Sequence, residues 1–299
     1  MKDSLGDRMK TNYEDCYRVH LPRRSYTIIR IDGKSFSNYT KNLERPFDLE
    51  LIEDMNDTAA YLCKNIMGAK FAYVQSDEIS ILLTDFDDVG TQAWFENNVQ
   101  KMVSVAASMA TAKFNQLRLL RGCSIPLVDT NGNEYKALHQ SGIENFKLAE
   151  FDARVFQIPQ KVEVENYFIW RQNDCTRNSI SSVAQSLYSH KELYGVSSDV
   201  KQELIFQKGI NWNDYPSRMK RGGFIAKVGD LWRKPKGSKT AGHKVPDEEV
   251  KDITQKIELH GMYYDPNFDY YKRTRWETVE CPIFTQDRWF LNSRIPDNQ

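Results

Sequence analysis

Residues 71–83, FAYVQSDEISILL, constrain the fold more than any other stretch of this 299-residue chain. Two short apolar runs flank the four polar residues 75–78. Apolar runs rich in β-branched and aromatic residues, separated by a tight polar segment, are typical of a β-hairpin. We therefore predict strands over residues 71–74 and 79–84, joined by a turn that carries the adjacent carboxylates Asp77 and Glu78.

The residues before and after this hairpin predict the rest of a sheet with helices. Residues 26–31, YTIIRI, predict a strand that stops at the turn 32–36, DGKSF. Apolar residues recur at three- and four-residue steps over 48–66 and again over 94–117, which predicts two amphipathic helices, the first capped by Asp48. The order strand, helix, strand, strand, helix indicates an α/β sheet covered by helices on one face.

The second half of the chain has a different character. After a polar loop at 131–133, we predict a strand over 151–158 and helices over 162–171, 179–193 and 198–207. A basic, irregular tract follows, with a loop over 234–244. Residues 208–244 hold 10 Lys or Arg and 2 Asp, whereas residues 42–98 hold 12 Asp or Glu and 3 Lys or Arg. The neutral net charge of the whole chain therefore hides an acidic segment and a basic one, and a merely solvated loop is one interpretation of the basic segment.

Several functional classes lack support in the sequence. The five cysteines and five histidines are dispersed, with no C-x-x-C pair, P-loop or G-x-G-x-x-G segment. The first residues lack the apolar core of a signal peptide, and no run reaches the length of a membrane span. We expect a soluble cytoplasmic protein with reduced thiols and no membrane partner.

Asp32 and Asp77 each follow an apolar strand, and the predicted topology can bring the two turns to one sheet edge. Two carboxylates held together repel each other unless a cation lies between them. Magnesium suits that role because it takes oxygen ligands and keeps positions open for phosphates. Two such ions about 4 Å apart serve phosphoryl and nucleotidyl transfer. An ordinary Asp-Gly turn and a solvated hairpin tip remain the alternatives.

Several segments resemble the tRNA-histidine guanylyltransferase superfamily. The similarity begins with residues 30–36 (RIDGKSF), 45–46 (RP) with Asp48, and 73–78 (YVQSDE). It continues in order along the chain from about residue 26 to residue 224, through Trp94-Phe95, Lys101, Ser104 and residues 151–154, 170–175, 201–206 and 210–213.

This resemblance implies a polymerase-palm-like antiparallel sheet with helices packed on it. The palm-like catalytic domain would span residues 1–158, and a largely helical, basic region that contacts tRNA would span 159–299. It implies a magnesium-dependent nucleotidyltransferase that adds nucleotides to the 5′ end of tRNA in the 3′-to-5′ direction. ATP and GTP are the implied substrates, and a homotetramer is the implied assembly.

The resemblance also assigns roles to individual residues. The implied ligands of two Mg²⁺ ions are Asp32, Asp77 and the Gly33 carbonyl, with Glu78 as a further catalytic residue. The implied contacts of one triphosphate are Lys34, Ser35, Phe36, Lys41 and Ser76. The implied contacts of a second triphosphate, or of the activated 5′ end, are Arg30, Lys101 and Arg154.

The chain departs from the guanylyltransferases proper at three places. Residues 176–179 read TRNS where the family has His-Ile-Asn-Asn, Ser37 replaces a histidine, and Asn98 replaces an arginine. These departures favour the guanylyltransferase-like branch, which repairs truncated tRNA 5′ ends on a template. Strict guanine addition to tRNA-histidine stays open, as do a different palm activity, such as nucleotide cyclisation or dinucleotide synthesis, and a non-catalytic RNA-binding protein.

Overall fold

The computed structural model describes residues 4–122, 124–128, 134–138, 146–237, 242–251, 253 and 267–298. The chain divides into two compact units, Met1–Ala226 with Thr278–Gln299, and Lys227–Glu277. The domain boundary predicted between residues 158 and 159 therefore falls inside the first unit. The segment that follows it packs on the same sheet, and residues 223–226 extend that sheet by one strand. The polar loop predicted at 131–133 lies outside the described residues.

The first unit is built on an antiparallel sheet in the order β6 (Phe151–Ile158), β1 (Tyr26–Gly33), β3 (Glu78–Leu83), β2 (Ala69–Gln75) and β7 (Gly223–Pro235). β7 contributes its first four residues to this unit, where Phe71 pairs with Ala226. The predicted hairpin is confirmed as β2 and β3. In the pairing of β1 with β3, Asp32 lies opposite Glu78.

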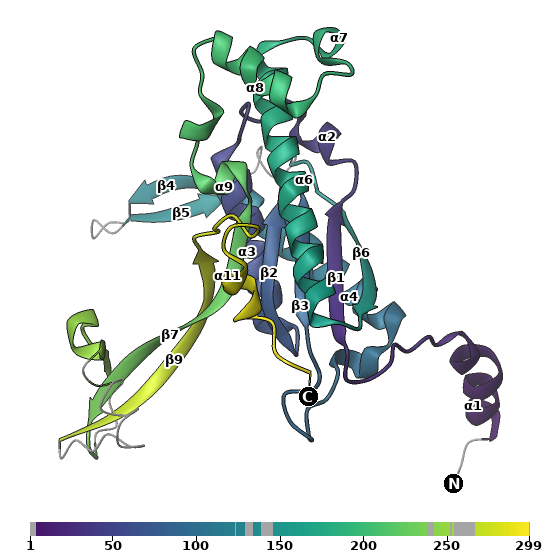
Figure 1. Ribbon diagram of the computed structural model, residues 1–299. Helices are drawn as coiled ribbons and strands as arrows, with labels where there is room; N and C mark the ends of the chain where they lie inside the picture. The colour runs from purple at the N-terminus through teal and green to yellow at the C-terminus, as the bar shows by residue number, and fades with distance from the viewer. Residues whose placement is uncertain are drawn as a thin grey trace. The chain divides into compact units, whose positions relative to one another are not determined.

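Helices cover both faces of this sheet, and not the single face predicted (Figure 1). α3 (Leu49–Asn65) and α4 (Val99–Gly122) pack on one face, and α6 (Lys161–Leu187) packs on the other. Side chains alternate between the faces along a strand. Tyr26 and Ile28 of β1 accordingly join Phe168 in the core under α6. Arg30 and Asp32 continue the same face, which therefore changes from apolar to charged along β1.

Two helix predictions need correction. The helix predicted from residue 94 begins at Val99, because Phe95, Glu96 and Asn97 have φ of 50°, 55° and 61° and form the separate turn η4 (Trp94–Asn97). The break predicted between residues 171 and 179 does not exist, since α6 is continuous over 27 residues. Its polar middle is stabilised by side-chain pairing, including an ion pair between Asp174 and Arg177 at 2.7 Å.

The remaining elements of the first unit are short. A second core joins the end of α6 to α7 (His190–Leu193), α8 (Ser198–Gln207) and η5 (Trp212–Asp214). The others are α1 (Ser4–Met9), η1 (Lys10–Glu14), η2 (Asp15–Tyr17), α2 (Phe36–Tyr39), η3 (Thr40–Asn42), β4 (Ser124–Val128), β5 (Glu134–Leu138), α9 (Ser217–Lys220) and α11 (Arg288–Asn292). Asp48 caps α3 as predicted, accepting a 2.8 Å hydrogen bond from the Leu51 amide.

The second unit contains the continuation of β7, paired with β8 (His243–Lys244) and β9 (Phe268–Val279). Part of the tract predicted to be irregular is thus extended strand, which β-branched and aromatic residues in 223–232 favour. Arg273 of β9 lies over the Trp232 ring, 4.2 Å from its centroid. No helix in the described part of the chain is long and apolar enough to cross a membrane.

Candidate active site

The two carboxylate-bearing turns lie side by side at one edge of the sheet. The Gly33 amide donates a 3.1 Å hydrogen bond to the Asp77 carbonyl, which joins the end of β1 to the tip of the β2–β3 hairpin. The predicted juxtaposition of Asp32 and Asp77 is therefore observed. It arises because β1 and β3 are hydrogen-bonded neighbours in the sheet.

Both turns hold a serine in the left-handed region of backbone space. Ser35 has a φ of 54° and Ser76 a φ of 49°. A residue with a Cβ atom pays a steric cost in this region, and such strain is concentrated at binding sites and active sites. Gly33 is required for a different reason, since an added Cβ would lie 2.2 Å from the Phe36 ring.

Asp77 is a largely buried carboxylate that lies close to two other negative charges. Burial raises the pKa of the Asp77 carboxyl, and the negative charges of Asp32 and Glu78 raise it further. Among the described residues, no Lys or Arg side chain forms an ion pair with Asp77. Asp32 is about one-third exposed, and Arg154 Nη2 lies 3.6 Å from its carboxylate.

The donor set fits magnesium. Asp32, Asp77 and the backbone oxygens of their turns are hard oxygen donors, and they leave coordination positions open for water and phosphate. In the part of the chain that the structure describes, no group of three or more His, Cys, Asp or Glu side chains is arranged to hold a metal. A site of two carboxylates that is completed by backbone oxygen, water and substrate phosphate agrees with that result.

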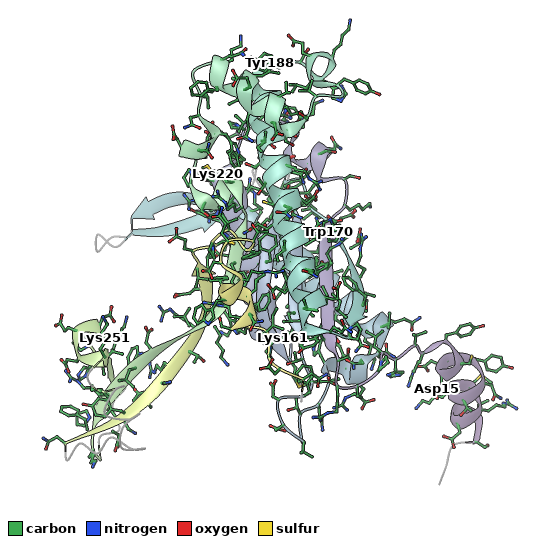
Figure 2. All side chains as sticks on the ribbon, viewed as in Figure 1. Asp15, Lys161, Trp170, Tyr188, Lys220 and Lys251 are labelled. Atoms are coloured by element: carbon green, nitrogen blue, oxygen red, sulfur yellow. The ribbon has the colours of Figure 1, made fainter. Side chains whose placement is uncertain are left out.

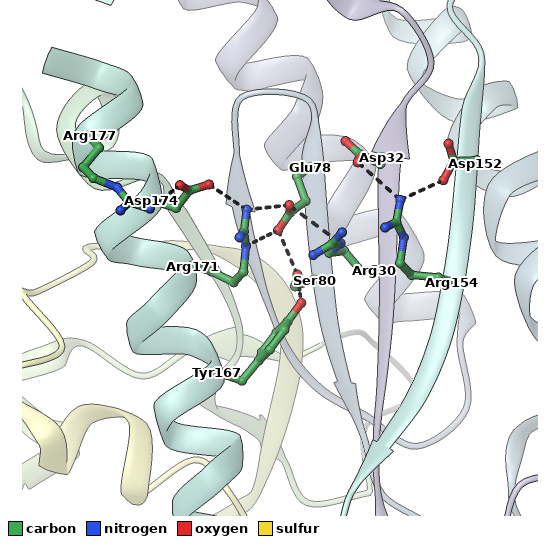
Figure 3. A network of polar contacts seen from close by, with 10 residues as sticks. All are labelled: Arg30, Asp32, Glu78, Ser80, Asp152, Arg154, Tyr167, Arg171, Asp174 and Arg177. Carbon is green, nitrogen blue, oxygen red and sulfur yellow. Dashed lines mark hydrogen bonds and ion pairs between the residues drawn. The ribbon is translucent and has the colours of Figure 1, made fainter. Parts of the chain in front are cut away.

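Glu78 differs from its two neighbours because it is buried and paired. Its side chain is 9% exposed and accepts hydrogen bonds from Arg171 Nε and Nη2, both 2.8 Å long. It also accepts a 3.2 Å bond from Ser80, whose hydroxyl bonds to that of Tyr167 at 2.8 Å (Figure 3). The Glu78 carboxylate is therefore fixed in place by Arg171 and Ser80 directly beside Asp77.

Two predicted arginines stand on the charged face. Arg30 Nε is buried without a hydrogen-bond partner and lies 3.9 Å from Glu78. Arg154 lies opposite Arg30 in the β1–β6 pairing and is 3.6 Å from both Asp32 and Asp152 (Figure 3). Both guanidinium groups are close enough to the carboxylates to meet an anion bound there.

The residues predicted to bind the triphosphate differ in their exposure and in their contacts. Lys34 is exposed and its Nζ pairs with Glu150 at 2.5 Å. The Phe36 ring is buried against Phe114 and Phe151, so that only its backbone is available to a ligand. Lys41 is exposed on η3.

Lys101 is not brought to the site within one chain. Its amide bonds to Asn98 at the start of α4, and Asn97 bonds to the Pro22 carbonyl before β1. Asp32 lies near the opposite end of that strand. The reason is that α4 begins beside the start of β1, a point that local periodicity does not reveal.

A cavity of about 610 Å³ adjoins the carboxylates, within the usual size range of ligand pockets. Asp32, Ser76, Asp77 and Glu78 line one part of it, and α6 lines another with Asn178 and small polar side chains. Of the residues that depart from the family, Ser37 and Ser179 belong to this lining, whereas Thr176, Arg177 and Asn98 do not.

The sequence prediction assigned no role to Arg171 or Tyr167. One signal was available for Arg171, because residues 164, 168, 171 and 175 follow helical spacing and the other three are apolar or a thiol. A charged residue on a buried stripe indicates a buried ion pair. Its partner, 93 residues earlier in the chain, could not be identified from spacing.

Comparison with known proteins gives consistent results. A sequence model of the tRNAHis guanylyltransferase family (Thg1) matches residues 6–159. The tRNA(His) guanylyltransferase of Debaryomyces hansenii is 27% identical over 222 residues, 70% of this chain and 76% of the relative. An uncharacterised protein of Acanthamoeba polyphaga mimivirus is 29% identical over 238 residues, 76% of this chain and 78% of that protein.

Two solved structures extend the similarity over almost the whole chain. Each is a bacterial tRNA(His) guanylyltransferase (Thg1)-like protein, one in complex with ATP and the other with GTP. The ATP complex is 39% identical with a TM-score of 0.71, and the GTP complex is 38% identical with a TM-score of 0.67. Both alignments cover 98% of this chain and 99% of the other.

Proposed function

Because this chain belongs to the tRNAHis guanylyltransferase family, and is thereby a nucleotidyltransferase, we propose that it is the magnesium-dependent, 3′-to-5′ type that repairs tRNA 5′ ends. The observation that carries the proposal is the Asp32–Asp77 pair, joined by the Gly33 to Asp77 backbone bond at the wall of a nucleotide-sized cavity. The substrates would be tRNA, ATP and GTP, in a cytoplasmic enzyme.

In this proposal Asp32, Asp77 and the Gly33 carbonyl hold two magnesium ions. When bound, magnesium would activate the attacking oxygen and neutralise charge on the leaving pyrophosphate. The raised pKa of Asp77 supports this assignment, since a carboxylate that is costly to ionise alone gains most from a bound cation.

The protein's own groups would position the reactants. Lys34, Lys41 and the backbone of the Ser35–Phe36 and Ser76 turns would hold one triphosphate near the carboxylates. Arg30 and Arg154 would neutralise the activated 5′ end or a second triphosphate. Lys101 lies near the other end of β1, so the fold of this chain does not bring its side chain to them. ATP would first transfer AMP to the tRNA 5′-monophosphate and release pyrophosphate. The 3′-hydroxyl of the incoming nucleotide would then attack that activated 5′ phosphate, form the new P–O bond and release AMP.

The cavity lining supports repair over strict guanine addition. Ser37 and Ser179 stand where the family's guanylyltransferases proper have a histidine and an asparagine, and both line the cavity. Smaller side chains at both positions leave room and remove specific donors, which suits an enzyme that takes its choice of nucleotide from an RNA template.

The test compares two labelled RNAs, a tRNA that lacks its first 5′ nucleotide and a full-length tRNA-histidine, each incubated with the four nucleoside triphosphates and Mg²⁺. We expect 5′ extension of the truncated tRNA at least about tenfold faster than guanine addition, a difference of about 1.4 kcal/mol. Asp77→Asn should lower the rate by roughly 10³-fold, because several kcal/mol of metal stabilisation are lost.

The matched control is Glu203→Gln, an exposed carboxylate on α8, which should react as the wild type does. Full activity of Asp77→Asn would refute the metal assignment. Guanine addition to tRNA-histidine with no extension of truncated tRNA would establish the alternative, strict activity. Products formed from free triphosphates while both RNAs stay unchanged would establish a different palm reaction.

A further inference from the structure

Arg171 occupies a place on α6 that helical periodicity assigns to the core. Val164, Phe168 and Cys175 on the same stripe are buried, and the Arg171 side chain is only 7% exposed. Its neighbour Trp170, marked on α6 in Figure 2, is about half exposed. Burying a guanidinium group costs several kcal/mol unless it is paired, so this position needs a specific partner.

That partner is the carboxylate beside the metal-binding turn. Two parallel hydrogen bonds of 2.8 Å join Arg171 to the two oxygens of Glu78, with both side chains less than one-tenth exposed. A bidentate pair of this kind fixes the orientation of the carboxylate as well as its position. α6 is thus connected to the first residue of β3.

Glu78 is adjacent to both of the proposed metal ligands. Glu78 directly follows Asp77 in the chain and lies opposite Asp32 in the β1–β3 pairing. Ser80 donates to this carboxylate, and the Tyr167 hydroxyl in turn bonds to Ser80 (Figure 3). Without Arg171, Glu78 would be a buried carboxylate whose nearest cation is Arg30, 3.9 Å away, and it would move toward water.

We propose that Arg171 is a positioning residue, which acts through Glu78 to hold the Asp77 turn in its metal-binding geometry. This inference rests on the proposed function, in that the turn matters because it holds the metal. Outer partners of metal ligands of this kind typically change metal affinity or activity by about 10–100-fold when removed.

The network also supplies a matched control on the same helix. Arg171 Nη2 contacts Asp174 at 3.0 Å, and Asp174 contacts Arg177 at 2.7 Å. The Arg177 side chain is 61% exposed. Arg177 carries the same charge as Arg171 but is separated from Glu78 by three successive contacts, so Arg177→Gln removes a positive charge from α6 without touching the Glu78 pair.

The experiment compares wild type, Arg171→Gln, Arg171→Lys and Arg177→Gln, each as the full chain. Three quantities are measured: kcat and KM for nucleotide addition to truncated tRNA, the affinity for Mn²⁺ alone by electron spin resonance, and Tm. For Arg171→Gln we expect kcat and Mn²⁺ affinity to fall by about 10–100-fold, with the nucleotide KM within about threefold of wild type. Arg171→Lys should recover part of the loss, because one hydrogen bond replaces the bidentate pair.

The results separate this inference from its alternatives. Arg171 also lines the cavity, and a rise in KM with unchanged kcat and Mn²⁺ affinity would make it a substrate contact and overturn the positioning role. Unchanged Mn²⁺ affinity in folded Arg171→Gln would overturn it as well, as would an equal loss in Arg177→Gln. If the wild type binds Mn²⁺ but adds nucleotides to no tRNA, the proposed function fails, and the Mn²⁺ affinities still decide whether Arg171 positions the turn.

Discussion

Two clusters of carboxylates in the described part of the first unit are neutralised in different ways. Between α3 and α4, the fully buried Asp54 receives bonds from Arg121 Nε at 2.6 Å and Arg118 Nη1 at 3.1 Å. At the sheet edge, Asp77 has a raised pKa and forms no ion pair with any Lys or Arg among the described residues. We call the Asp54 cluster self-neutralised, because its counter-charges are side chains of the protein. We call the Asp32–Asp77 cluster open, because its negative charge is not fully balanced by described side chains.

We propose that this difference separates a structural role from a functional one. A buried carboxylate with two guanidinium partners contributes to the folded state and has no need of a ligand. An incompletely neutralised pair costs stability in the free protein and favours a bound cation. Three changes test whether the two clusters differ in this way.

Breaking the self-neutralised cluster should have the largest effect on stability. We expect Asp54→Asn to lower the free energy of unfolding by about 3 kcal/mol. Arg118 and Arg121 would then lose the negative charge of the fully buried carboxylate that both of them contact. Urea unfolding monitored by circular dichroism measures this change. Nucleotide addition, assayed where the variant is folded, should keep the wild-type rate, and a selective loss of kcat would contradict the structural role.

A change in the backbone of the open cluster should have a smaller effect. In Gly33→Ala the new Cβ would meet the Phe36 ring, which is itself packed against Phe114, and overpacking of this kind costs about 1–3 kcal/mol. Gly90→Ala is the control, since its Cβ would meet nothing closer than Asp88 Oδ1 at 3.4 Å. Equal unfolding free energies for the two variants would show that the Gly33 turn can relax.

The third change, Asp77→Asn, should have the smallest effect on stability, and it should raise stability where the other two lower it. Because the folded state raises the pKa of Asp77 above its unfolded value, metal-free protein binds more protons there when folded, and stability declines as pH rises through that pKa. Asp77→Asn removes this decline and should stabilise the metal-free protein near neutral pH by about 0.5–2 kcal/mol. Thermal unfolding of both proteins in EDTA from pH 4 to 7.5 measures the difference. A lower Tm for Asp77→Asn throughout would mean that the open cluster is stabilising.

Local sequence was enough to predict much of this site. Two apolar runs separated by polar residues identified the hairpin, and the Asp48 cap and the α3 stripe were confirmed. The Asp32–Asp77 juxtaposition followed from the order of strands. Predictions failed where the conformation depends on distant contacts, as in the left-handed turn at Phe95–Asn97 and the uninterrupted α6.

The sequence by itself determined the parts that depend on neighbours along the chain: which segments are strands, where the two turns fall, and which carboxylates they carry. Only the tertiary structure decided how those carboxylates are neutralised. Arg171 reaches Glu78 across 93 positions and Arg121 reaches Asp54 across 67, and no Lys or Arg pairs with Asp77 in the described part of the chain. Counter-charges act through distances in space, and the packing of helices on the two sheet faces sets those distances.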